Sequence, residues 1–277
     1  MKKWLASCFF ITVLLSSPAH GGADPRTEGL VDTIIRQERL EHELAQLPET
    51  LSILTSTNFF AADSPQEKKR KRDMLISAFD PAAALRQVKE YFLAQGDTGT
   101  FEQVAAWIDS PIGKKISAVE AESETFESQA NELLFFSRLD SAPPSAARVD
   151  KIRAIVAASG ELDMFLRLLD GLARNVPGKE MTGEEPAKVR ERIERSGPVL
   201  TGELRQEAFL DALYTYRSVS DEELDDYVRF LRSDACQRFF RLAIEATGRA
   251  FDSFLERYMK ALAGDGRGLQ KGVVNSH

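Results

Sequence analysis

Apolar residues recur at spacings of three and four along most of this 277-residue chain, as they do in helices that bury one face. The clearest apolar stripes lie in residues 28–47, 112–133 and 240–262. No run of four or more residues alternates in the β-branched pattern of a strand, so strands are not expected. The pattern therefore predicts an all-α fold.

Capping residues and prolines mark where the helices start. Ser64, Asp80 and Ser110 each precede a proline, which needs no backbone donor in the first turn of a helix. Ser220 and Glu223 have the spacing of a capping box. These signals and the apolar spacing predict a helix that starts at Ser64, helices over 81–94, 98–108, 111–133, 146–159, 161–175, 186–195 and 200–217, and a last helix from Ser233 to Gly264.

The two halves of the chain share an order of caps and apolar positions. Residues 31–34 recur as 149–152 at an offset of 118, and residues 91–110 correspond to 214–233 at an offset of 123. The difference implies an insertion of five residues in the loop at 176–185. Repeated helical units bury their apolar faces against one another. The sequence therefore predicts a helical bundle built from two tandem related helical units.

Five segments follow from this organisation. Residues 1–23 are expected to be a signal peptide and residues 24–140 the first helical unit. A stretch rich in proline and serine predicts a linker at 141–147, and the second helical unit follows at 148–263. The glycine-rich end, residues 264–277, is expected to be a flexible tail.

The amino-terminal segment has the three parts of an export signal. Lys2 and Lys3 precede an apolar core from Leu5 to Leu15, and small residues follow up to Ala23. This pattern predicts secretion across the inner membrane and a periplasmic location. The apolar core is shorter than the roughly 20 residues that a helix needs to cross a bilayer, and no later stretch is long enough either. No transmembrane anchor is therefore expected.

Charge and composition argue against several classes of function. The chain has 36 Lys and Arg against 43 Asp and Glu, and removal of the signal makes it more acidic by two charges. Such a protein has no overall field for nucleic acid. Cys236 is the only cysteine after the signal, and His42 is the only histidine between the signal and the last residue. We therefore expect no cofactor, no metal site and no nucleophilic triad, and we favour a protein that is not an enzyme.

The most distinctive motif spans residues 107–115. It contains Trp107, Ser110, Pro111 and Gly113, followed by two lysines. This motif resembles the signature of domain of unknown function 2059, a family of exported bacterial helical proteins. The resemblance implies an exported, all-helical protein of unassigned activity, with no catalytic residues to carry over. Because Ser-Pro is a typical helix start, we interpret these residues as a structural motif.

A second copy of the motif occurs in the other half of the chain. It contains Phe230 in place of the tryptophan and retains the serine as Ser233. Asp234 replaces the proline and Cys236 replaces the glycine, so the second copy departs from the family pattern. The resemblance thus covers about 25 residues in each half, and the rest of the chain agrees only in its helical pattern.

The strongest local candidate for an interaction surface is a run of five basic residues, Lys68, Lys69, Arg70, Lys71 and Arg72. Apolar residues follow it in the same helix, so the segment is both basic and amphipathic. Such a face can meet lipid headgroups, an acidic polysaccharide or an acidic protein. The alternative is an ordinary solvated helix face.

Three functions remain open on the sequence. The leading hypothesis is a non-enzymatic interaction module that binds another envelope protein or assists envelope assembly. The alternative is a carrier that holds an apolar small molecule or lipid between the two helical units, where phenylalanine pairs such as Phe239-Phe240 present rings to two surfaces. The third is a hydrolase that uses carboxylates alone, although no particular pair of acids is indicated.

Overall fold

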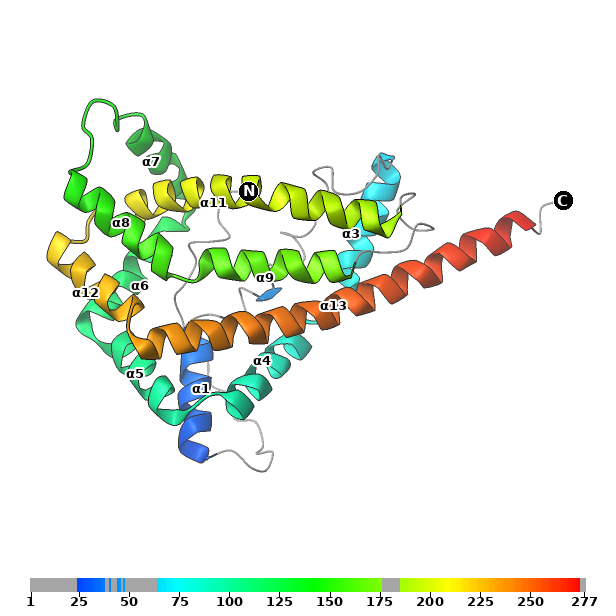
Figure 1. Cartoon of the computed structure of the whole chain (residues 1–277), viewed down its shortest axis with the longest axis horizontal. Helices are drawn as coiled ribbons and strands as arrows, with labels where there is room; N and C mark the ends of the chain where they lie inside the picture. Colours follow the sequence, from blue (N-terminus) through cyan, green and yellow to red (C-terminus); the bar gives the residue numbers. More distant parts are fainter. Residues whose placement is uncertain are drawn as a thin grey trace.

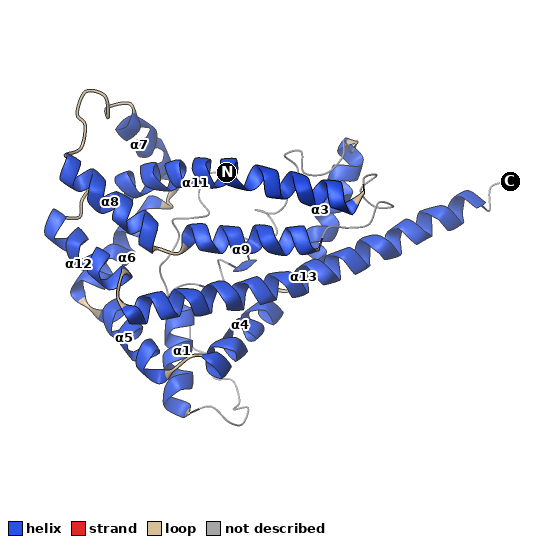
Figure 2. Ribbon diagram, in the orientation of Figure 1, coloured by secondary structure: helices blue, strands red, loops and turns tan. Residues whose placement is uncertain are grey.

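The computed structural model describes residues 24–37, 40, 44, 45, 47, 64–175 and 185–274, and all regular structure in these residues is α-helical (Figure 2). The predicted all-α fold is therefore confirmed. The helices are α1 (Pro25–Gln37), α3 (Pro65–Ala78), α4 (Pro81–Gln95), α5 (Thr98–Asp109), α6 (Pro111–Ser123), α7 (Phe126–Phe136), α8 (Ala146–Ala158), α9 (Glu161–Arg174), α11 (Pro186–Thr215), α12 (Asp221–Leu231) and α13 (Asp234–Val274). The predicted signal peptide and most of the 176–185 loop lie outside the described residues.

Helix α13 runs along the length of the molecule (Figure 1). It packs against α3, α4 and α5 of the first half and against α9 of the second half. Helix α11 packs on α9 and α8, α12 packs on α8, and α1 packs on α5. The second half thus supplies the helix on which much of the first half is assembled, so the two halves interleave and do not form separate bundles.

The apolar core has two main clusters that meet at the start of α13. One surrounds the middle of α13 and includes the fully buried rings of Phe92 and Phe251. The other lies between α6, α8 and α12 and includes Leu231. Phe239 belongs to the first cluster, where its ring meets that of Phe92 edge to face, and Phe240 packs against both clusters. The adjacent rings therefore face two surfaces, as the sequence predicts for such a pair.

Helices at the predicted offset of 123 residues start at equivalent caps. Asp97 caps α5 and Ser220 caps α12, where a complete capping box with Glu223 confirms the sequence prediction. Ser110 caps α6, and Ser233 accepts a hydrogen bond from the third residue of α13. This shared order is what a duplication predicts. The duplication itself remains a prediction, because the interleaved halves do not form two units that stand apart.

The prediction of one helix over 111–133 is wrong, because this segment forms two helices, α6 and α7. Thr125 lies in an extended conformation and its hydroxyl accepts a hydrogen bond from the backbone of Ser128, which starts a new helix. Phe126 and Leu133 were expected to continue the buried stripe of α6. They are instead 88% and 59% exposed. A cap in mid-pattern rotates the following helix, and apolar spacing alone does not reveal that rotation.

Two other helices are longer than predicted. Helix α11 runs unbroken past Pro198, where the sequence predicts separate helices over 186–195 and 200–217. Helix α13 continues to Val274, beyond the expected end at Gly264. A proline in a helix costs about 3 kcal/mol and a glycine about 1 kcal/mol, so neither residue by itself has to end a helix. None of the helices in the described ranges is both long and apolar enough to cross a bilayer.

A candidate binding cavity between the two halves

A cavity of about 310 Å³ lies where the two halves of the chain meet. Helices α5 and α6 of the first half and α8, α9, α11, α12 and α13 of the second half contribute to its wall. Most of the lining side chains are aliphatic or aromatic, among them Ile116, Ile155, Phe165, Phe240 and Ile244. We refer to this space as the cavity. Its lining makes it a candidate site for an apolar ligand.

The signature motif builds one wall of the cavity. Trp107 at the end of α5 stacks on Phe230 of α12, with ring centroids 4.4 Å apart and planes 7° apart, and both rings line the cavity. The Ser110 hydroxyl donates to the Trp107 carbonyl over 2.6 Å and accepts from the Gly113 amide over 3.0 Å. Pro111 opens α6 in the position that needs no donor. The motif residues thus fix the angle between α5 and α6.

Gly113 is required by this close approach. A Cβ atom at this position would lie 2.1 Å from the carbonyl oxygen of Trp107, far inside van der Waals contact. In the second copy Cys236 replaces the glycine, and its buried side chain lines the cavity. The two copies of the motif therefore differ at this position, with glycine in one and cysteine in the other.

Glu120 is a buried carboxylate in the wall formed by α6. Its Oε1 accepts hydrogen bonds from the hydroxyls of Tyr216, over 2.6 Å, and Tyr227, over 3.3 Å. Burial and the adjacent Glu120 raise the pKa of Tyr216 well above its ordinary value. Both effects disfavour a phenolate, so Tyr216 remains a hydrogen-bond donor to the carboxylate.

Two more carboxyl groups face the cavity from α9 and α11. Glu161 is the first residue of α9, directly after Gly160, which has a left-handed conformation and provides no side-chain cap. Burial, and then the charge of Asp211 on α11, raise the pKa of Glu161 to about 8. At neutral pH this carboxyl group is therefore mostly protonated. Among the described residues, none forms a hydrogen bond or ion pair with the Glu161 side chain.

A hydroxyl group on α13 completes the polar part of the cavity. Thr247 lines the cavity and is only 6% exposed, and its Oγ1 has no hydrogen-bond partner. A buried hydroxyl without a partner is unfavourable and is seldom retained without a role. By contrast, no Lys, Arg or His occurs among the described residues that line the cavity. The cavity is thus apolar over most of its surface, with carboxyl and hydroxyl groups at a few points.

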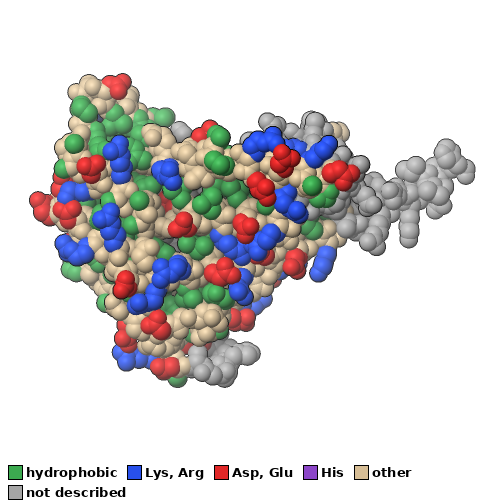
Figure 3. Space-filling model, in the orientation of Figure 1, with side chains coloured by type: hydrophobic (Ala, Val, Ile, Leu, Met, Phe, Trp, Pro, Cys, Tyr) green, Lys and Arg blue, Asp and Glu red, His purple; other side chains and the backbone are tan. Residues whose placement is uncertain are grey.

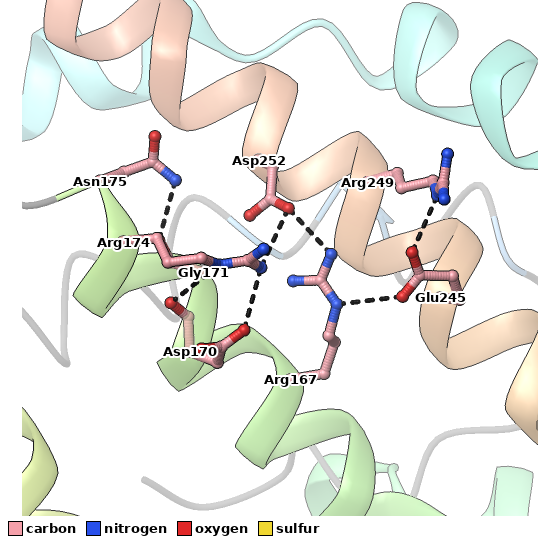
Figure 4. A network of polar contacts seen from close by, with 8 residues as sticks. All are labelled: Arg167, Asp170, Gly171, Arg174, Asn175, Glu245, Arg249 and Asp252. Atoms are coloured by element: carbon pink, nitrogen blue, oxygen red, sulfur yellow. Dashed lines mark hydrogen bonds and ion pairs between the residues drawn. The ribbon is translucent and has the colours of Figure 1, made fainter.

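A charged network holds two walls of the cavity together (Figure 4). Arg167 of α9 donates from Nη2 to Asp252 of α13 over 2.8 Å and from Nε to Glu245 over 3.3 Å. Arg174 reaches the same Asp252 oxygen over 3.2 Å. A Cβ atom at Gly248 would lie 2.5 Å from the Arg167 Nε, so glycine is what allows the guanidinium to lie against α13. The network lies outside the cavity and sets the spacing of α9 and α13.

The basic run does not reach the cavity. It lies on α3, which Figure 1 shows at the opposite end of α9 from α5, α6 and α12. Lys69 pairs with Asp73 over 2.7 Å on the exposed face of this helix, and the Tyr258 hydroxyl donates to the Lys71 carbonyl over 3.4 Å. The structure does not describe the side chain of Lys68. The structure thus places the run on a helix that packs against α13, remote from the candidate site.

The acidic residues at the start of α12 have structural partners. Asp221 pairs with Arg148 of α8 over 2.7 Å, Glu223 pairs with Lys115 of α6 over 2.6 Å, and Asp225 pairs with Lys151 of α8. The hydrogen bond from Lys115 lowers the pKa of Glu223. These pairs attach α12 to its two neighbours. In the part of the chain that the structure describes, no group of three His, Cys, Asp or Glu side chains could hold a metal ion.

Comparison with known proteins adds no relative to this description. No family model, no curated protein and no solved structure matches the chain. The resemblance of residues 107–115 to domain of unknown function 2059 therefore remains a prediction, and the candidate function rests on the geometry of the cavity.

Proposed function

We propose that this protein is a non-enzymatic carrier for a small apolar molecule, which it holds in the cavity between its two halves. The observation that carries the proposal is an apolar cavity of about 310 Å³ with few polar groups. A dry cavity of about 150 Å³ accommodates benzene, so this cavity has room for a bicyclic ring system or a medium-length alkyl chain. Export to the periplasm, predicted from residues 1–23, is part of the proposal.

The side chains that line the cavity favour binding of an apolar ligand over hydrolysis of a sugar chain. Glu120, Glu161 and Asp211 all line the cavity, so a carboxylate-based hydrolase deserves comparison. Hydrolysis of a glycan needs two carboxyl groups that flank a polar sugar chain. Here the carboxyl groups are set among apolar side chains, and Glu120 already accepts hydrogen bonds from two phenols. An apolar ligand fits this environment better than a sugar does.

The experiment is a calorimetric titration of residues 24–277 with octanol, a neutral apolar probe. We expect saturable binding of one octanol per chain. Ala212→Phe on α11 places a ring into the cavity and should abolish binding, whereas Ala187→Phe, on the exposed surface of the same helix, should not. If Ala212→Phe does not fold, Ala243→Leu is a second variant that fills less of the cavity. Equal octanol affinity in a folded cavity-filling variant and in the control would contradict the proposal.

A second candidate function is favoured by the exposed apolar face of α7. Phe126, Leu133 and Leu134 are 88%, 59% and 55% exposed, and Figure 3 shows hydrophobic side chains gathered at the edge of the molecule where α7 lies. Such a face is typical of a contact surface for another protein, which agrees with the interaction module expected from the sequence. The test is whether a stoichiometric envelope protein co-purifies with the native chain and is lost on Phe126→Ser with Leu134→Ser, but not on Val199→Ser.

A further inference from the structure

The charged side chains that the structure describes in the cavity wall are all acidic. They come from three helices, Glu120 from α6, Glu161 from α9 and Asp211 from α11, and no basic side chain lies among the described lining residues. The amino end of α9 contributes a partial positive charge of about half a unit. That contribution is smaller than the full charge of one ionised carboxylate, so the described part of the wall favours a cation over an anion.

Two polar groups in the wall have no hydrogen-bond partner among the described residues, and a ligand could supply one. No described residue forms a hydrogen bond or ion pair with the Glu161 carboxyl group. The Thr247 Oγ1 is buried against the cavity without any hydrogen-bond partner. Both can accept a hydrogen bond, so N–H donors on a ligand would suit them.

We infer that the ligand is an apolar amine, whose ammonium group binds at the Glu161 carboxyl group while its hydrocarbon part occupies the rest of the cavity. The inference rests on the proposed carrier function and adds the chemical class of the ligand. An ammonium group is compact and has three donors and no acceptor. It can donate to the Glu161 carboxyl group, and it leaves the aliphatic and aromatic wall for the carbon skeleton. A fatty acid of the same length would bring a second negative charge to these acids.

Binding of such a ligand changes with pH in a defined direction. Since the pKa of free Glu161 is about 8, its carboxyl group is mostly protonated at pH 7, and a bound cation favours the ionised form. The amine therefore displaces a proton, and its affinity rises as the pH rises from 6 to 8. Among the residues that the structure describes, the other titratable groups that line the cavity are Asp211 from α11, Glu120 from α6, Tyr227 from α12, Cys236 from α13 and Tyr216.

The test compares octylamine, octanol and octanoate by calorimetry at pH 7. Octylamine is protonated at this pH, as a lysine side chain is. We expect it to bind about tenfold more tightly than octanol, the value of one hydrogen bond to a charged group, and octanoate to bind most weakly. Titrations in buffers of different ionisation enthalpy should show proton release with octylamine and none with octanol.

The variant that removes the carboxylate proposed to bind the ammonium group is Glu161→Gln. This variant should remove the advantage of octylamine over octanol. Asp163→Asn, at an exposed acid on the same helix, should change neither affinity. If octanol binds but octylamine binds no more tightly, or releases no proton, the inference is wrong and the carrier function stands. If none of the three probes binds, the carrier function itself is wrong.

Discussion

The Trp107 ring stacks on the Phe230 ring with centroids 4.4 Å apart. The two residues occupy the same position in the two copies of the signature motif, 123 residues apart. The Tyr227 ring of α12 is also nearly parallel to that of Trp107, with centroids 6.0 Å apart. The contact joins α5 of the first half to α12 of the second, and its rings also line the cavity. One contact between equivalent residues thus connects the halves and forms part of the candidate site.

Loss of this contact should destabilise the fold. We expect Phe230→Ala to lower the free energy of unfolding by about 3 kcal/mol, because it removes the stacked ring and leaves a gap beside the cavity. Urea unfolding followed by circular dichroism measures the change. Phe126→Ala makes the same chemical change at a ring that is 88% exposed and should cost less than about 0.5 kcal/mol. Equal losses of stability at the two positions would show that the stacked rings do not stabilise the fold.

Gly113 should not tolerate alanine. A Cβ atom there would lie 2.1 Å from the Trp107 carbonyl oxygen, so α5 and α6 must separate. We expect Gly113→Ala to lower the free energy of unfolding by about 3 kcal/mol. The matched variant is Gly202→Ala in α11, where no atom lies within 4 Å of the added Cβ. It should raise stability by about 0.5 kcal/mol, because alanine favours the helix. An unchanged free energy of unfolding in Gly113→Ala would contradict the close contact between Gly113 and the Trp107 carbonyl group.

Stability should fall as the pH rises from 5 to 8, with Glu161 as one source. Its folded pKa of about 8 lies above the ordinary value of 4.5, so in this range the folded chain binds a proton that the unfolded chain has released. After allowance for partial exposure to water, the loss amounts to about 2 kcal/mol. Glu161→Gln should remove this part of the pH dependence, and Asp163→Asn should retain it. Urea midpoints at several pH values provide the measurement.

The Arg167 network should stabilise α9 against α13 more than surface ion pairs do. The Arg167 side chain is 14% exposed and contacts both Glu245 and Asp252. We expect Arg167→Ala to cost about 2 kcal/mol of stability, because it leaves the partly buried Asp252 with fewer partners. It should also weaken octanol binding, since α9 and α13 both line the cavity. The control is Arg195→Ala, which removes the ion pair between Arg195 and Glu191. Because the Arg195 side chain is 73% exposed, its loss should cost less than about 0.5 kcal/mol.

Local features of the fold could be predicted from the sequence because they depend on neighbouring residues. Ser220 and Glu223 form the expected capping box, and Ser110 with Pro111 starts α6. The break at Thr125 and the continuous path through Pro198 were not predicted. At Thr125 a local cap starts a new helix inside a continuous apolar pattern. At Pro198, which is exposed, the helix continues despite the proline. Apolar spacing and helix propensity therefore predict that helices form here better than they predict where each one ends.

The polar groups of the candidate site could not be predicted from the sequence. Glu120, Glu161 and Asp211 lie on three helices that only the fold brings together. One signal was present: Glu120 follows Ile116 and Val119 on the apolar face of its helix, where a carboxylate is unusual. The basic run from Lys68 to Arg72 was more conspicuous in the sequence. It lies elsewhere, because charge density along a chain does not reveal what the folded chain encloses.

The measurement that tests the carrier function most directly is a crystal structure of residues 24–277 soaked with bromo-octanol, with the bromine located by its anomalous scattering. The account predicts one strong bromine site inside the cavity, among Trp107, Ile155 and Phe240, and loss of that site in Ala212→Phe. Bromine bound only on the outer surface, or a cavity that remains free of ligand while the crystals are saturated with it, would contradict the proposal.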